Sequence, residues 1–233
     1  MKLVEREAGG ADYNDAVLKN GGSANKRSRD TLWLARVRHG WVALWVVGLL
    51  ATGAGAAESA AQRVRLLDLK GREVEPLTGT DARATVFVFT RTDCPISNRY
   101  APEVQRIYYE FASVDVAFWL VYVDPEESVA VIRRHLNDYA YPFGALFDPQ
   151  HQLVRLTGVR VTPEVAVFVS GGAQARMVYR GRIDDKYVEL DKERPQPTTH
   201  DLENVLRLIV EGKPVKSETT RAVGCFISDL EAR

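Results

Sequence analysis

Two long apolar runs dominate the hydrophobic pattern of this 233-residue chain. ATVFVFT (84–90) and VDVAFWLVYVDP (114–125) are rich in β-branched and aromatic residues and contain few polar positions. Continuous runs of this kind are typical of strands that are buried on both faces of a sheet. We therefore expect both segments to be central strands.

Each of these runs is followed by a helical pattern. Between residues 96 and 111, apolar side chains recur at helical spacing and form one face that can pack on a sheet: Ile96, Tyr100, Val104, Ile107, Tyr108 and Phe111. Segment 127–140 predicts a second helix, which opens with acids that suit a helix N-terminus. The alternation of strand and helix predicts a parallel sheet with right-handed crossovers.

Two hairpins should add antiparallel strands and make the sheet mixed. The first covers residues 64–77, with Lys70 and Gly71 at its turn. The second joins strands at 161–170 and 173–183 across a glycine turn.

Two shorter helical segments complete the pattern. HQLVRLTG predicts a helical turn that closes on Gly158. After a linker with two prolines, a last helix has Thr198 or Thr199 as its N-cap and ends at Gly212 and Pro214.

Composition is that of an ordinary globular protein, with 45% hydrophobic and 27% charged residues and no net charge. Basic residues gather in the first 39 positions, so the remainder is mildly acidic. This distribution excludes the basic surface that nucleic-acid binding requires.

Residues 36–57 have the three parts of a secretory signal. Basic residues precede an apolar stretch from Trp41 to Leu50, and small residues allow cleavage after Ala56 or Ala57. A membrane span would need about 20 apolar residues, which this stretch does not reach. We expect an exported protein, periplasmic or extracellular, with membrane contact only through an uncleaved signal.

The predicted organisation has four parts. Residues 1–35 are polar and form either a disordered extension or sequence that precedes the natural start. The signal peptide occupies 36–57, the folded domain 58–226 and a short tail 227–233.

Cys94 is the first candidate for chemistry, because it lies where strand 84–90 gives way to a helix. A thiolate at a helix N-terminus is stabilised by the dipole and by free N–H groups, which lowers its pKa. Pro95 suits the first helical turn, Arg91 and Arg99 add positive charge, and Asp93 opposes them. The alternative is an inert buried cysteine. The polar neighbours Thr92, Asp93 and Ser97 favour a reactive thiol.

These motifs, T-D-C-P-x-S, then V-D-P, then G-V-R-V-T-P-E, resemble the thioredoxin superfamily over about residues 62–226. More closely, the chain is similar to exported redoxins of the alkyl hydroperoxide reductase and thiol-specific antioxidant (AhpC/TSA) type. The resemblance implies an α/β fold with a mixed central sheet flanked by helices, an N-terminal hairpin and a C-terminal tail that folds back. It also implies that Pro163, preceded by Thr162, is a cis-proline that faces the cysteine and shapes a substrate groove.

The chain departs from this pattern in two places. Ser97 occupies the position of the second thiol in C-x-x-C reductases, so local resolution is unavailable. Arg91 occupies the place three residues before the cysteine where peroxidases of the family tend to carry threonine.

Cys225 is the second cysteine of the chain, and similar redoxins end in a comparable G-C element. Gly224 gives the backbone freedom to turn the thiol. A Cys94–Cys225 disulfide would close a loop of about 130 residues, worth on the order of 4 to 5 kcal/mol. The alternatives are that Cys225 pairs with another molecule or stays free, and a bridge could be catalytic or structural.

Other polar candidates point to structure. His135, His151 and His200 match no zinc spacing, so we expect no metal and no cofactor. Asp124 and Asp148 follow strands beside prolines, where acids form turns, although Asp124 could also act near Cys94.

Two functions from different classes follow. In the first, the protein is a thiol oxidoreductase in which Cys94 attacks a protein disulfide or a hydroperoxide and Cys225 resolves the product, with an unknown reductant. In the second, it is a non-enzymatic binding or metal-delivery module with a structural Cys94–Cys225 disulfide.

Overall fold

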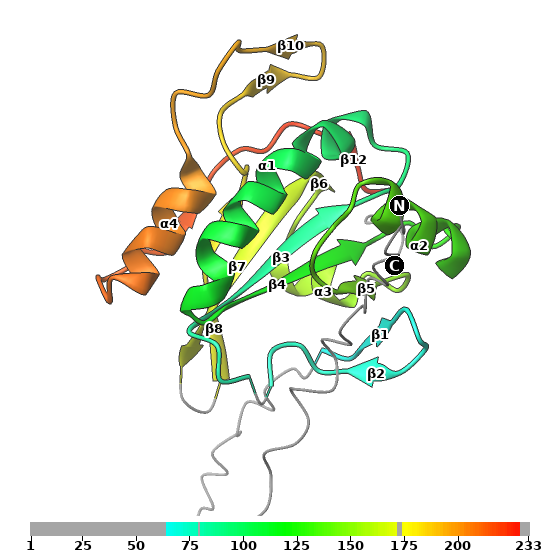
Figure 1. Cartoon of the computed structure of the whole chain (residues 1–233), viewed down its shortest axis with the longest axis horizontal. Helices are drawn as coiled ribbons and strands as arrows, with labels where there is room; N and C mark the ends of the chain where they lie inside the picture. The colour runs from blue at the N-terminus through cyan, green and yellow to red at the C-terminus, as the bar shows by residue number, and fades with distance from the viewer. Residues whose placement is uncertain (1–63, 79, 172–173, 229–233) are drawn as a thin grey trace, which may run out of the picture. The chain divides into compact units, whose positions relative to one another are not determined.

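The computed structural model describes residues 64–78, 80–171 and 174–228 (Figure 1). The segments predicted as extension and signal peptide, together with the ends of the predicted domain and tail, lie outside these residues.

Strands and helices alternate as the sequence predicts. The helices are α1 (Pro95–Phe111), the 3-10 helix η2 (Ala112–Val114), α2 (Val129–Asp138), α3 (Gln152–Thr157) and α4 (Asp201–Val210). The strands are β1 (Leu66–Asp68), β2 (Glu73–Val74), β3 (Ala84–Thr90), β4 (Val116–Tyr122), β5 (Ala145–Phe147), β6 (Val161–Thr162), β7 (Glu164–Gly171), β8 (Gln174–Gly181), β9 (Tyr187–Glu189), β10 (Lys192–Glu193), β11 (Glu218–Thr219) and β12 (Cys225–Phe226).

Within the described residues, eight strands form one mixed sheet in the order β11-β8-β7-β3-β4-β5-β1-β2. β3 lies in its middle, parallel to β4 and antiparallel to β7. Every residue of β3 is buried, which confirms the prediction of a central strand. The predicted mixed α/β architecture is therefore confirmed, including the N-terminal β1–β2 hairpin.

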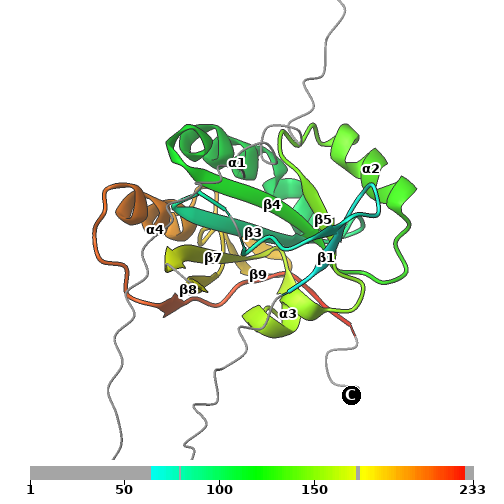
Figure 2. The same cartoon turned by 90° about the horizontal axis from the view of Figure 1, so that it is seen from below.

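Helices cover both faces of the sheet. Figure 2 shows α1, α2 and α4 on one side and α3 on the other. Side chains alternate along a strand, so Val86 and Val88 of β3 pack toward the α1 side while Phe87 and Phe89 pack with α3. Both faces being covered explains why β3 is apolar at consecutive positions.

Two helix starts differ from the prediction. α2 begins at Val129 and is capped by the Ser128 side chain, without acids in its first turn. α4 begins at Asp201 after His200, so neither Thr198 nor Thr199 is its cap. Both threonine N–H groups instead bind the Asp185 carboxylate, which holds the linker against the domain.

Two strands also depart from the prediction. β5 was not expected, because its three residues lie in a short apolar segment without alternation, yet β5 pairs with β4 in parallel. The expected strand 161–170 is divided at Pro163 into β6 and β7.

The C-terminal tail folds back on the domain, as the resemblance implies. β11 pairs with β8, and β12 forms a separate antiparallel pair with β6. Ile227 is buried, and its N–H donates to the carbonyl of Arg160 at 3.0 Å. Across the described residues, no helix is long and apolar enough to cross a bilayer.

Candidate active site at Cys94

Cys94 lies between the end of β3 and the start of α1, where the sequence placed it. It is the N-cap of α1, with extended backbone angles, and Pro95 is the first helical residue. The N–H of Ser97 donates to Cys94 Sγ at 3.5 Å. The side chain is only 1% exposed, so the sulfur is enclosed by protein.

Thr162 and Pro163 face the sulfur from the other side. Cys94 Sγ lies 2.9 Å from the carbonyl oxygen of Thr162, to which the thiol donates. The Thr162–Pro163 peptide bond is cis, as the resemblance implied.

Cys225 lies beside the same pair of residues. In the β6–β12 ladder Cys225 is paired with Thr162, and its side chain is hydrogen-bonded to that of Cys94. Both cysteines are free thiols in the structure. The fold therefore brings together two sulfurs that are far apart in sequence.

Gly224 makes this approach possible for a reason that the sequence did not reveal. A Cβ at this position would lie 2.1 Å from the carbonyl oxygen of Thr162. Glycine is required by lack of space, and not by the backbone freedom that we expected.

The two thiols differ in acidity. Burial acts to raise the pKa of Cys94, but the side chains of Cys225, Ser97 and Thr162, with the Ser97 N–H, outweigh it by stabilising the thiolate, so the net pKa is lowered. Burial, the hydrogen bond to Cys94 and the charge of its thiolate raise the pKa of Cys225 to about 12. Cys94 is therefore the more acidic thiol of the pair, and Cys225 keeps its proton to a higher pH.

Two buried hydroxyls adjoin the Cys94 sulfur. Ser97 Oγ and Thr162 Oγ1 have no hydrogen-bond partner among the described residues. Both side chains favour the thiolate form of Cys94. A free hydroxyl that can turn its proton toward sulfur is a donor of this kind.

The charged neighbours are arranged around Arg91. Its guanidinium lies 2.8 Å from Asp124 and 3.0 Å from Asp93. Arg91 lowers and Asp93 raises the pKa of Cys225, so this pair acts on the tail thiol. Asp124 pairs with Arg91, and its carboxylate also lies within 4.8 Å of those of Asp93 and Glu127.

Arg99, which we expected to add charge at Cys94, is directed elsewhere. It is exposed, and its guanidinium interacts with Tyr187 and Glu193. Thr92 contributes through its backbone, which is bound by Glu127 and Asn98. The sequence signal for these two partners is weak, because Asn98 lies one turn into α1 and Glu127 lies 35 positions after Thr92.

Comparison with known proteins shows the family of this chain. Residues 57–181, more than half of the chain, match the family model described as AhpC/TSA family. The chain belongs to the AhpC/TSA family. No curated protein matches it.

Solved structures similar to this AhpC/TSA chain support the fold. An uncharacterized conserved protein from Geobacillus kaustophilus is 23% identical with a TM-score of 0.61, over 74% of this chain and 92% of its own. A hypothetical protein from Sinorhizobium meliloti is 21% identical with a TM-score of 0.59, over 72% and 92%. A secreted disulfide oxidoreductase from Mycobacterium tuberculosis is 16% identical with a TM-score of 0.43, over 65% and 96%. The first two structures show that this mixed α/β fold is shared with other proteins.

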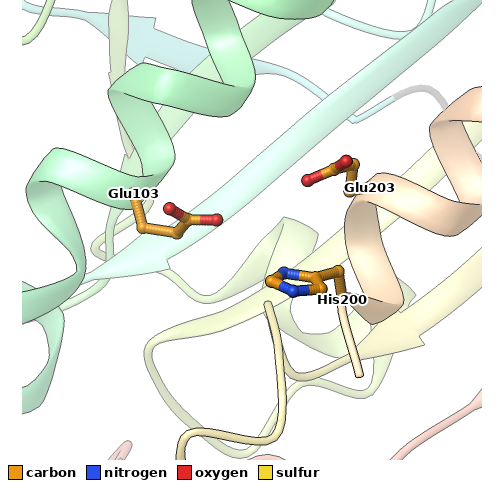
Figure 3. Close-up of side chains that lie close together, drawn as sticks. All are labelled: Glu103, His200 and Glu203. Atoms are coloured by element: carbon orange, nitrogen blue, oxygen red, sulfur yellow. The ribbon is translucent and has the colours of Figure 1, made fainter. Parts of the chain in front are cut away.

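Three metal-ligating side chains of this AhpC/TSA domain lie together between α1 and the start of α4. Glu103 of α1 points toward His200 and Glu203 at the start of α4 (Figure 3). The Arg106 guanidinium already binds both carboxylates, and Arg207 binds Glu203 at 2.6 Å. A cation would have to displace Arg106, so we assign the cluster to joining α1 and α4.

A cleft of about 400 Å³ opens beside the tail. Its walls come from β6, from the β9–β10 hairpin and from the tail on both sides of Cys225. Phe226 at its rim is 76% exposed. The half-buried Cys225 is thus the more accessible of the two sulfurs.

Proposed function

We propose that this AhpC/TSA-family protein is an exported thiol-disulfide oxidoreductase that uses Cys94 as nucleophile and Cys225 as resolving cysteine. The observation that carries the proposal is the contact between the two side chains, which the β6–β12 pairing creates. An oxidising compartment, as residues 36–57 predict, is where such a pair can persist as a disulfide.

The first step is attack on a substrate disulfide. The Cys94 thiolate attacks one sulfur, a mixed disulfide forms, and the other sulfur leaves as a thiolate that takes up a proton. The helix N-terminus and Ser97 favour the attacking thiolate. Thr162 and Pro163 shape the groove in which the substrate lies.

The second step depends on the change in charge at Cys94. The thiolate of Cys94 raises the pKa of Cys225, and this effect disappears when Cys94 enters the mixed disulfide. Cys225 then loses its proton to the departing thiolate and attacks Cys94 Sγ. The products are a reduced substrate with two thiols and an oxidised Cys94–Cys225 pair, so two electrons and two protons have moved.

Approach of a substrate requires the tail to shift, because Cys94 is buried beneath it. Only two residues of β12 pair with β6, and the Ile227 N–H adds a hydrogen bond to Arg160, so the segment around Cys225 is held by few hydrogen bonds. Short strands of this kind open at low free-energy cost. A protein disulfide can therefore reach Cys94 by displacing β12.

Disulfide exchange is favoured over peroxide reduction by the residue three positions before the cysteine. Arg91 occupies that place, and Asp93 and Asp124 bind its guanidinium.

The test is turnover by the full-length chain with a protein disulfide and with hydrogen peroxide, each supplied with a dithiol reductant. Catalytic disulfide reduction that Cys94→Ser abolishes is the expected result. Equal turnover in that variant, or stoichiometric binding without turnover, would contradict the proposal.

A further inference from the structure

The peptide of Thr92, two residues before Cys94, is held at both of its polar groups. Its N–H donates to Glu127 Oε1 at 2.6 Å, and its carbonyl accepts from Asn98 Nδ2 at 3.0 Å. The Cys94 N–H donates to the Arg91 carbonyl at 3.4 Å and so closes a turn between these residues. The place of the Cys94 sulfur therefore depends on side chains that never touch it.

Asn98 is itself held by a buried chain of hydrogen bonds. Asn98 Oδ1 lies 2.8 Å from His135 Nε2, and His135 Nδ1 lies 2.8 Å from the hydroxyl of Tyr122. Tyr122 is fully buried and His135 is 6% exposed. These hydrogen bonds join α1, α2 and β4.

The donor and acceptor roles in this series of hydrogen bonds have one consistent assignment. The Asn98 amide donates to Thr92, so its oxygen is the acceptor that faces His135. His135 then carries its proton on Nε2, and the Tyr122 hydroxyl donates to Nδ1. Burial lowers the pKa of His135, which keeps the ring neutral as this arrangement needs, although Asp138 of the same helix opposes the shift.

We propose that Asn98 is a positioning residue for Cys94. Aligned by His135 and Tyr122, it fixes the Thr92 peptide and so directs the Cys94 sulfur toward the N–H of Ser97 and toward Cys225. The contact that depends on this alignment is the 3.5 Å hydrogen bond from Ser97, which is long and is lost with a small rotation of the loop. The inference rests on the proposed function only in taking Cys94 as the reacting group.

Helix α1 also provides a matched control residue, Gln105. Gln105 Nε2 donates to the carbonyl of Tyr139 at 2.7 Å, so it also links α1 to the α2 region through an amide and a carbonyl. Gln105 lies about two turns further along α1 than Asn98. Its removal costs a hydrogen bond of the same kind without touching the Thr92 peptide.

The test measures the pH profile of the Cys94 thiolate by its ultraviolet absorbance in the full chain with Cys225→Ser, so that one thiol remains. We expect Asn98→Ala to raise the pKa of Cys94, with about three- to tenfold less thiolate below that pKa, as the loss of one hydrogen bond implies. Asn98→Asp, which keeps an acceptor for His135 but loses the donor to Thr92, should do the same. Gln105→Ala should leave the profile unchanged.

Tyr122→Phe provides a second variant that keeps the volume of the core. It removes the donor to His135 Nδ1, so a smaller shift in the same direction is expected. An unchanged Cys94 profile in both Asn98 variants would overturn the proposal, as would an equal shift in Gln105→Ala. Disulfide turnover of the unmutated chain separates the two claims. A shifted Cys94 profile in the Asn98 variants, together with no turnover by the unmutated chain, supports the positioning role and contradicts the proposed function.

Discussion

The two sulfurs of the candidate site lie in regions that are built very differently. Cys94 is fixed between a fully buried central strand and a 17-residue helix, with 1% of its side chain exposed. Cys225 lies in a two-residue strand that is bound to the domain along one edge. In the proposed reaction, this difference makes Cys94 the rigid nucleophile and Cys225 the movable resolving partner, whose displacement lets a substrate in.

The largest expected effect distinguishes the two thiols by their roles. Cys94→Ala should abolish both turnover and covalent capture of substrate, since the nucleophile is gone. Cys225→Ala should also abolish turnover, but a mixed disulfide between Cys94 and the substrate should accumulate. Non-reducing electrophoresis with mass spectrometry checks this, and a trapped species at Cys225 in the Cys94 variant would reverse the assignment.

The next effect tests how the tail is held. Gly224→Ala places a Cβ against the carbonyl of Thr162, and such overpacking costs about 1 to 3 kcal/mol in a rigid core. Because β12 is short, we expect the tail to detach and the global unfolding free energy to fall by less than about 1 kcal/mol.

Alkylation of Cys94 reports this detachment, and it should become several-fold faster in Gly224→Ala. Phe226→Ala is the matched control, because this neighbour in the tail is 76% exposed and its side chain does not make the strand pairing. Slow alkylation in the glycine variant, or equally fast alkylation in both, would show that the β12 pairing does not cover Cys94.

A third prediction concerns the pH dependence of the two thiols. The folded pKa of Cys94 is below its ordinary value, so its thiolate stabilises the fold above the unfolded pKa and this stabilisation is lost as pH falls through the folded pKa. The pKa of Cys225 is raised to about 12, so its contribution to stability has the opposite pH dependence. That contribution is present below the unfolded pKa and is lost as pH rises toward the folded value. Titration of the two thiols in the reduced, unmutated chain, each followed separately by its alkylation rate, should show one thiol on each side of the free cysteine range.

Each thiol should also shift the pKa of the other in a defined direction. Cys225→Ala removes a donor to the Cys94 thiolate and should raise the pKa of Cys94. Cys94→Ala removes the thiolate that faces Cys225 and should lower the pKa of Cys225. Independent titrations, unaffected by removal of the other cysteine, would contradict the contact between them.

The smallest effect is expected far from the sulfurs, at the Glu103–His200–Glu203 cluster. Arg106 is partly exposed, so Arg106→Ala should cost about 1 kcal/mol or less of unfolding free energy, and less in high salt. Disulfide turnover should be unchanged. A loss of turnover would link this cluster to the site.

Prediction from sequence succeeded where local patterns suffice. The buried runs at 84–90 and 114–125 and the helical spacing after Cys94 identify the strand-to-helix junction without any knowledge of distant contacts. The position of Cys225 followed only from resemblance, because pairing of β12 with β6 joins segments about 60 residues apart and leaves no periodic signal.

The residues that the sequence did not reveal are those whose role depends on three-dimensional neighbours. Gly224 is required by the carbonyl of Thr162, and Glu127 acts on a peptide 35 positions earlier. Arg99 shows the opposite case, since its closeness in sequence suggested a role at Cys94 but the helix directs it to Tyr187. Helix geometry and strand pairing decide these contacts, and neither is visible in the composition of a short motif.

The most direct test of the central claim is peptide mapping of the oxidised full-length chain by mass spectrometry. After a single exposure to a protein disulfide under non-reducing conditions, we predict an intramolecular Cys94–Cys225 disulfide in the monomer and loss of both free thiols. Recovery of Cys94 only as a mixed or intermolecular disulfide, with Cys225 still a free thiol, would contradict the claim that the tail cysteine resolves the reaction.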